Sequence, residues 1–237
     1  EMWSNLDHVD LGKPRIVLTG AGRVARGAML TLDRAGFRKV EIDEYFADPN
    51  CGSVYVQLHP RQYFQRKDGG EGNLKDIVNN PSLYRSDFMR YAKNSEIYIA
   101  GHYWEAPSPF IFTRQDASSS DFNISVVADI SCDIDGPVAC TIRPSTIENP
   151  VYGYNPQTEQ EDDYSKQGVI AVMAVDNLPC ELPRDASEGF GEELIRHIAP
   201  LLSGKDSDTI LERATIAKQG KLTHGYKYLE SYVAGVE

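Results

Sequence analysis

Short apolar runs alternate with polar and glycine-rich stretches along most of the chain, a pattern typical of α/β proteins. Uninterrupted apolar runs predict strands that are buried on both faces of a sheet. We expect strands at 15–19, 39–43, 54–58, 97–100, 125–130 and 170–175, helices at 21–35, 82–92 and 184–202, and a largely helical stretch at 208–233. Strands separated by such crossovers predict a Rossmann-type α/β fold, a doubly wound parallel sheet with helices on both faces.

A glycine turn joins the first predicted strand to the first predicted helix. Gly20, Gly22 and Ala25 fit the G-x-G-x-x-G/A fingerprint of dinucleotide sites. In such a turn Gly20 lets the chain bend, Gly22 lets a pyrophosphate approach the backbone, and Ala25 lets helix and strand pack closely. An ordinary strand-turn-helix connection is the alternative. Arg23 follows the turn and either contacts phosphate or is solvated on the helix.

The second predicted strand ends in a carboxylate, Asp43, 23 residues after Gly20. An acid at this position accepts hydrogen bonds from the ribose hydroxyls and repels a 2′-phosphate, so the sequence predicts NAD rather than NADP. Asp43 could instead be a polar strand end. Basic residues of the irregular segment 44–94, such as Arg61, could also fold back over the site.

Polar residues follow three further predicted strands. They are His102 and Tyr103, then Ser131, Cys132 and Asp133, then Asp176 and Asn177. The carboxyl ends of parallel strands share one edge of a sheet, where ligands bind. His102 has the pKa range of an acid–base catalyst, yet no partner is visible in the sequence, so a bystander at a strand end is the favoured interpretation. Asp133, Asp176 and Asn177 could be turn or cap residues as well as ligand contacts.

Composition narrows the class of protein. The 237 residues carry a net charge of −11, which argues against general nucleic-acid binding. No apolar run is long enough for a membrane span. The four cysteines and five histidines show no metal-ligand spacing, so no metal site is predicted. Unpaired cysteines and the absence of a signal peptide favour a reduced, cytoplasmic protein.

Several motifs in order resemble one family. The segments Asp129-Ile130-Ser131-Cys132-Asp133 and Val175-Asp176-Asn177-Leu178-Pro179, followed by Leu182-Pro183-Arg184-Asp185-Ala186-Ser187, resemble those of saccharopine dehydrogenases and lysine-ketoglutarate reductases. Tyr103-Trp104 and Asn80-Pro81-Ser82-Leu83-Tyr84 are closer to the reductases, whereas the long segment 44–94 departs from the lysine-forming enzymes.

The resemblance implies the architecture of alanine dehydrogenase and transhydrogenase. It implies a lead-in at 1–12, a dinucleotide-binding domain at 13–202, and a C-terminal helical segment at 203–237 that belongs to a second domain. It also implies hydride transfer between nicotinamide and the C–N carbon of saccharopine, a small amino-acid substrate formed from lysine and 2-oxoglutarate. An alanine-dehydrogenase-like enzyme and a non-catalytic nucleotide-binding module are the alternatives.

The resemblance also implies roles for individual residues. Residues expected to contact the cofactor are Gly20, Gly22, Arg23, Val24, Asp43, Tyr103, Ile130, Val175, Asp176, Asn177 and Leu178. Ser131, Cys132 and Asp133 would face the substrate. In the family a Lys and a His act as the acid–base pair from a domain ahead of the cofactor fold, so no catalytic pair is expected within these residues.

Overall fold

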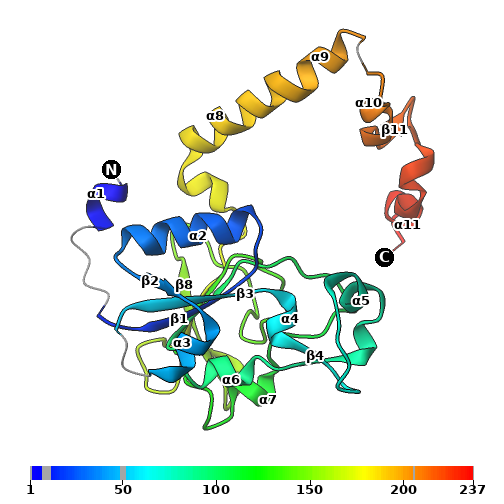
Figure 1. Cartoon of the computed structure of the whole chain (residues 1–237). Helices are drawn as coiled ribbons and strands as arrows, with labels where there is room; N and C mark the ends of the chain where they lie inside the picture. The colour runs from blue at the N-terminus through cyan, green and yellow to red at the C-terminus, as the bar shows by residue number, and fades with distance from the viewer. Residues whose placement is uncertain (1, 7–11, 49–51, 205, 237) are drawn as a thin grey trace. The chain divides into compact units, whose positions relative to one another are not determined.

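A computed structural model describes residues 2–6, 12–48, 52–204 and 206–236, and Cys51 lies outside these ranges (Figure 1). The chain forms two compact units, Glu1–Leu178 and Pro179–Glu237. The division falls at Pro179, whereas the sequence places the change of domain at residue 203.

The first unit is built on one sheet. Within the described residues it has eight strands in the order β2-β3-β1-β6-β7-β10-β8-β9. The first six are mutually parallel, whereas β8 and β9 run antiparallel at one edge. Their bounds are β1 Arg15–Thr19, β2 Arg38–Val40, β3 Val54–Leu58, β6 Ile97–Ala100, β7 Val126–Asp129, β8 Val151–Asn155, β9 Gln160–Asp162 and β10 Ile170–Met173. The predicted mostly parallel, Rossmann-like α/β fold is confirmed.

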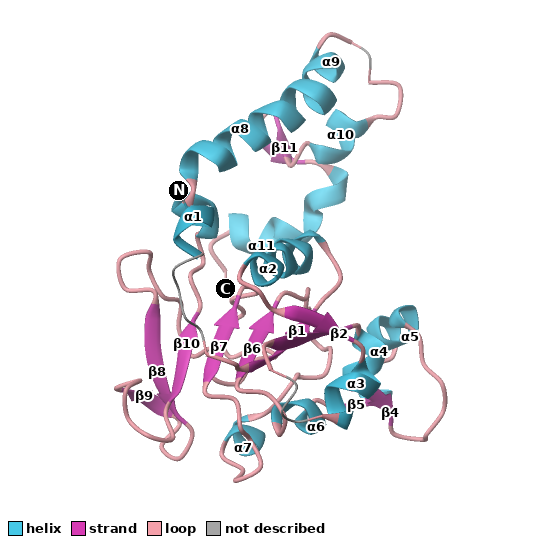
Figure 2. Cartoon of the chain, turned by 60° about the vertical axis from the view of Figure 1, so that its left-hand side comes forward, coloured by secondary structure: helices cyan, strands magenta, loops and turns pink. Residues whose placement is uncertain are grey.

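Helices lie on both faces of this sheet (Figures 1 and 2). Helix α2 (Arg23–Arg34) covers one face, and α3 (Ile42–Ala47), α6 (Met89–Ala92) and α7 (Arg114–Ala117) lie on the other. Side chains of β1 alternate between the two cores, since Ile16 packs in the cluster with Leu32 of α2 and Val17 packs in the larger cluster opposite. All five residues of β1 are buried, which explains its continuous apolar run.

The second predicted strand is shorter and lies elsewhere than expected. β2 ends at Val40, and Asp43 lies in the first turn of α3 rather than at a strand end. Helix formation here buries Tyr45 completely, and acidic residues are favourable in a first helical turn. β2 is the outermost strand on its side, because β3 lies between it and β1.

The irregular segment after β3 contains a small hairpin. The whole segment comprises α4 (Pro60–Tyr63), β4 (Phe64–Arg66), α5 (Leu74–Asn79), the 3₁₀ turn η1 (Pro81–Leu83) and β5 (Tyr84–Ser86). β4 and β5 pair antiparallel, so the helix predicted at 82–92 is wrong except for α6 at its end. Tyr84 is buried and pairs with Arg66 of β4, and this tertiary packing overrides the local helical pattern.

The second unit is mostly helical. The predicted helix at 184–202 appears as α8 (Pro183–Glu193), a π-helical turn η3 (Leu194–Ile198) and α9 (Ala199–Leu202); the 3₁₀ turn η2 (Leu178–Glu181) precedes it. The stretch 208–233, for which the sequence predicts largely helical structure, is helical only in part. It is divided into α10 (Ile210–Ala214), the hairpin β11–β12 (Ala217–Lys218 and Lys221–Leu222), η4 (His224–Leu229) and α11 (Glu230–Val233). Gln219 and Gly220 both have positive φ, as a two-residue hairpin turn requires.

Among the described residues, Met2–Leu6 forms the short helix α1, and no helix has the length and apolar character needed to cross a membrane.

Candidate cofactor site

The strands β1 and β6 lie side by side at the point where the chain reverses its direction across the sheet. From β1 the chain continues to β2 and β3 on one side, and from β6 it continues to β7 and β10 on the other. The backbone N–H of Gly101 donates to the carbonyl of Thr19 at 3.0 Å, which holds the two carboxyl ends together. Ligands of open α/β sheets bind at such a switch point.

The glycine turn after β1 is shaped by the end of β6. Gly20 has φ +110°, and a Cβ on it would lie 2.2 Å from the carbonyl oxygen of Gly101. Only glycine therefore fits at this position. A Cβ on Gly22, in contrast, would meet no atom of the protein within 4 Å. The two glycines differ in purpose, since Gly20 allows the packing and Gly22 leaves space beside the backbone.

Helix α2 begins directly after this space. Gly22 is its N-cap, the first turn contains no acidic residue, and Arg23 and Val24 are exposed. The free N–H groups of a helix N-terminus attract anions. Ala25 is fully buried, and its Cα lies 3.3 Å from the position of a Cβ on Gly101. A larger side chain at either position would push the helix away from the sheet.

A cavity of about 950 Å³ opens at this point. Its lining includes seven residues that the sequence points to, namely Gly20, Gly22, Arg23, Val24, Tyr103, Ser131 and Asp133. It also includes residues that the sequence reasoning did not assign to the site, among them His59, Pro60, Tyr63, Val78, His102 and Trp104. These come from segments after β3 and β6, which the strand order brings to the glycine turn.

The loop after β7 is held by the buried carboxylate of Asp129. One oxygen accepts hydrogen bonds from the backbone N–H groups of Ser131 and Cys132 and, at 2.5 Å, from the Ser131 hydroxyl; the other accepts from Thr141 at 2.6 Å. Cys132 adopts φ +53°, an uncommon conformation that this clamp stabilises. Burial, and secondarily the charge of Asp129, raises the pKa of Asp133 at the cavity wall.

The Cys132 thiol has a structural contact and a raised pKa, neither of which favours reactivity. It donates a hydrogen bond to the carbonyl of Ala174 at 3.1 Å, which joins the loop after β7 to the end of β10. Burial and then the charges of Asp129, Asp176 and Asp133 raise its pKa to about 11, so the thiolate is scarce at neutral pH.

The remaining residues expected at the cofactor lie outside the cavity lining. Val175 is buried, Asp176 and Asn177 are exposed, and Ile130 and Leu178 are half-buried. They follow the carboxyl ends of β7 and β10 without lining the cavity, so their contact with a cofactor stays a prediction.

Asp43 is exposed on α3 and does not line the cavity. On the side of β2 the strand next to β1 is β3, whose carboxyl end is followed by His59, Pro60 and Arg61. The expected position of Asp43, at the end of the second strand, is therefore wrong, because β2 ends at Val40 and Asp43 lies on α3. The sequence shows the apolar run 54–58 but not which of two runs pairs with β1.

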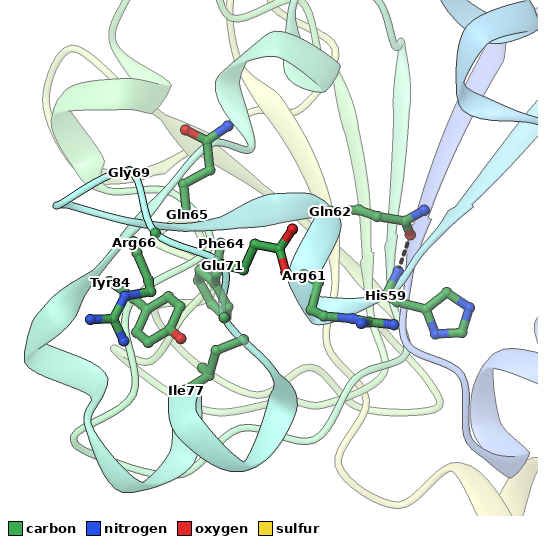
Figure 3. A pocket seen from close by; sticks show the side chains of 12 residues that line it. His59, Arg61, Gln62, Phe64, Gln65, Arg66, Gly69, Glu71, Ile77 and Tyr84 are labelled. Atoms are coloured by element: carbon green, nitrogen blue, oxygen red, sulfur yellow. Dashed lines mark hydrogen bonds between the residues drawn. The ribbon is translucent and has the colours of Figure 1, made fainter.

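His59 also lines a second cavity of about 780 Å³ together with Arg61, Gln62, Arg66 and Glu71 (Figure 3). Arg66 is engaged by Asp68 at 2.7 Å and by Asp76 at 2.6 Å. Arg61 forms no ion pair within the described ranges, and in Figure 3 its guanidinium extends toward the side that His59 lines. Of the two arginines that line this cavity, Arg61 is therefore the one without an ion pair among the described residues, and it can meet an anion.

A hydrogen-bonded chain lies behind the glycine turn. Thr19 Oγ1 is 2.9 Å from the Tyr98 hydroxyl and 2.8 Å from His102 Nδ1. Burial lowers the pKa of His102 to about 4, against the opposing charge of Asp129, so the ring is neutral at physiological pH. Its Nε2 is buried and has no hydrogen-bond partner among the described residues.

Residues 88–227 match the model of the family "alanine dehydrogenase/PNT, C-terminal domain". The mitochondrial alpha-aminoadipic semialdehyde synthase of Mus musculus is 27% identical over 250 aligned positions, which cover 93% of this chain and 27% of that protein. The saccharopine dehydrogenase (NAD⁺, L-lysine-forming) of Schizosaccharomyces pombe is 32% identical over 114 positions, covering 48% of this chain and 29% of that protein. The chain thus spans little more than a quarter of the length of these relatives.

A solved structure of L-alanine dehydrogenase shares the fold. It superposes with a TM-score of 0.51 at 13% sequence identity, covering 93% of this chain and 54% of that one.

Proposed function

The chain belongs to the alanine dehydrogenase/PNT C-terminal domain family, and from this premise we propose that the cavity beside the glycine turn binds a nicotinamide dinucleotide. The observation that carries the proposal is the open space at Gly22, next to the N-terminus of α2 and between the carboxyl ends of β1 and β6. A pyrophosphate in this space would meet backbone N–H groups without a side chain in its path.

The residues present fit such a ligand. Helix α2 has 12 residues and carries no acid in its first turn, so nothing there repels phosphate. Arg23 is exposed at the same helix end and can add a charge-assisted hydrogen bond. The overall charge of −11 does not oppose this, because the field at the turn is set by local N–H groups.

We further propose that the chain is the cofactor-binding part of a saccharopine-type oxidoreductase of lysine metabolism. The matches to an aminoadipic semialdehyde synthase and a saccharopine dehydrogenase support this assignment. A bound nicotinamide would accept hydride from the carbon of the secondary C–N bond of saccharopine. The imine left on the substrate would then take up water and separate into lysine and 2-oxoglutarate, with one proton released.

The lining residues have distinct tasks in this proposal. Ser131 and Asp133 lie on the loop that Asp129 clamps, where they can orient the substrate beside the nicotinamide. The exposed ring of Tyr103 can cover the cofactor. The acid–base pair is expected from another domain, as the family resemblance implies.

Product analysis tests the reaction. A protein that joins this chain to the acid–base domain of a saccharopine-type relative should oxidise NAD(P)H with lysine and 2-oxoglutarate, but not with pyruvate and ammonia. The reverse preference would indicate an alanine-dehydrogenase-like enzyme. Tight dinucleotide binding without turnover on either pair would indicate a regulatory module.

For cofactor choice we propose that Arg61 and His59, rather than Asp43, meet the 2′ position of the adenosine ribose. Both residues follow β3, the neighbour of β1 on the side of β2, and in Rossmann folds the residues after that neighbouring strand contact the ribose. Arg61 has no ion-pair partner in the described parts of the chain. An arginine there accommodates a 2′-phosphate, so the geometry favours NADP over the NAD that the sequence alone predicts.

Titration calorimetry with both cofactors decides between them. We expect NADPH to bind about tenfold more tightly than NADH, and Arg61→Gln to remove that preference. Arg85→Gln on the exposed face of β5 removes the same charge outside both cavities and is the control. A preference for NADH that Asp43→Ala relaxes would instead support the prediction from the sequence.

A further inference from the structure

The chain of hydrogen bonds from Tyr98 to His102 has a defined direction. Tyr98 is fully buried, its pKa is raised by burial, and its one hydroxyl partner among the described residues is Thr19. The tyrosine proton is therefore donated to Thr19 Oγ1, since the described residues place no other acceptor in reach. The other partner of the Thr19 hydroxyl among them is His102 Nδ1 at 2.8 Å, so the Thr19 proton has an acceptor only if this nitrogen is unprotonated.

This direction fixes the tautomer of the imidazole. A neutral ring that accepts at Nδ1 carries its proton on Nε2. His102 is thus a hydrogen-bond donor whose N–H has no acceptor within the described protein. A buried donor without a partner costs about 1–3 kcal/mol, and such groups occur at sites that a ligand completes.

The position of His102 indicates which ligand this is. Its backbone nitrogen lies 2.9 Å from the place of a Cβ on Gly20, so the residue adjoins the glycine turn directly. The imidazole lines the same cavity as Gly22 and Arg23. In the dinucleotide site proposed above, this part of the cavity holds the pyrophosphate, whose oxygens are strong acceptors.

We propose that His102 donates a hydrogen bond from Nε2–H to a pyrophosphate oxygen of the bound dinucleotide, and that Thr19 and Tyr98 are positioning residues that hold the ring in the required tautomer. The assignment rests on the proposed dinucleotide site. It gives a binding role to a histidine for which the sequence favours a bystander, because the hydroxyl that donates to its Nδ1 comes from Thr19 of β1 and cannot be seen in the local sequence.

Nitrogen NMR of the histidine-labelled 237-residue chain tests the proposal without any substitution. The His102 signals are identified because they are missing from the spectrum of His102→Gln. At pH 7 they should show a protonated Nε2 and an unprotonated Nδ1. Adding NADPH or ADP should shift the Nε2 signal, whereas adenosine, which lacks the diphosphate, should leave it in place. A protonated Nδ1, or an Nε2 signal unchanged at saturation with NADPH, would overturn the inference.

Binding measurements separate a ligand contact from a structural role. His102→Leu should weaken ADP and NADPH about tenfold and leave adenosine affinity unchanged, the expected loss of one hydrogen bond to a charged group. His102→Gln should retain most of the affinity, because its amide can donate from a similar position. Thr19→Val should mix the two tautomers of His102. His197→Leu in the second unit is the matched control.

The outcomes distinguish the inference from the function on which it rests. If the unsubstituted chain binds no dinucleotide, the proposed function fails and the His102 assignment fails with it. If NADPH binds but His102→Leu binds it equally well, only the His102 assignment fails.

Discussion

At the scale of single residues, two glycines of the same turn should respond differently to substitution. Gly22→Val places a branched side chain in the space proposed for pyrophosphate, so dinucleotide affinity should fall at least about tenfold, roughly 1.4 kcal/mol. Gly27→Val is the control, since Gly27 also has no neighbour within 4 Å but lies further along α2, outside the cavity. Calorimetry that finds equal binding by Gly22→Val would exclude this turn as the phosphate site.

The second residue-scale prediction concerns pH. The pKa of His102 is about 4 in the folded protein, against an ordinary value of 6.5. Between these values the unfolded chain binds a proton that the native His102 does not, so stability falls as the pH falls through this window. The loss from this group should reach about 3 kcal/mol below pH 4, at about 1.4 kcal/mol per pKa unit. Urea unfolding from pH 7 to 4 should show a flatter profile for His102→Gln; parallel profiles would contradict the prediction.

At the scale of elements, the loop after β7 depends on one carboxylate. Asp129→Ala removes the acceptor for the Ser131 and Cys132 backbone and for Thr141, so the free energy of unfolding should fall by about 3 kcal/mol. Asp129→Asn keeps one oxygen for the loop and an amide that can donate to Thr141, so its loss should be about 1 kcal/mol. Thermal unfolding measures both; equal losses would mean that the charge, not the hydrogen bonds, matters.

Some helices and strands could be predicted from the sequence alone, and others could not. The strand Arg15–Thr19 forms with the bounds that its apolar run predicts, and the turn and α2 follow, because glycine conformation and helical periodicity are local properties. The segment 82–92 has a helical pattern as well, yet Tyr84 pairs into β5, because packing against β4 outweighs local propensity.

At the scale of the whole molecule, the prediction concerns catalysis. The family resemblance places the acid–base pair in another domain, and the chain covers 27% of the mouse synthase. We therefore expect residues 1–237 alone to bind cofactor without measurable saccharopine turnover, followed by NAD(P)H absorbance. Robust turnover by this chain would contradict the expectation and direct attention to Asp133 and His102. The full-length mouse synthase, of which this chain covers 27%, is the positive control.

The sequence by itself determined the fold class, the glycine turn and the family, since each rests on neighbouring residues or on motifs read in order. Only the tertiary structure decided which groups meet at the cavity. The strand order inserts β3 between β2 and β1, which separates Asp43 from β1 and places His59 and Arg61 after the carboxyl end of the strand beside β1. Thr19 and His102 are 83 residues apart in the sequence, so the hydrogen bond between them forms only once β1 and β6 pair. Strand pairing depends on side-chain packing between distant segments, which no local pattern specifies.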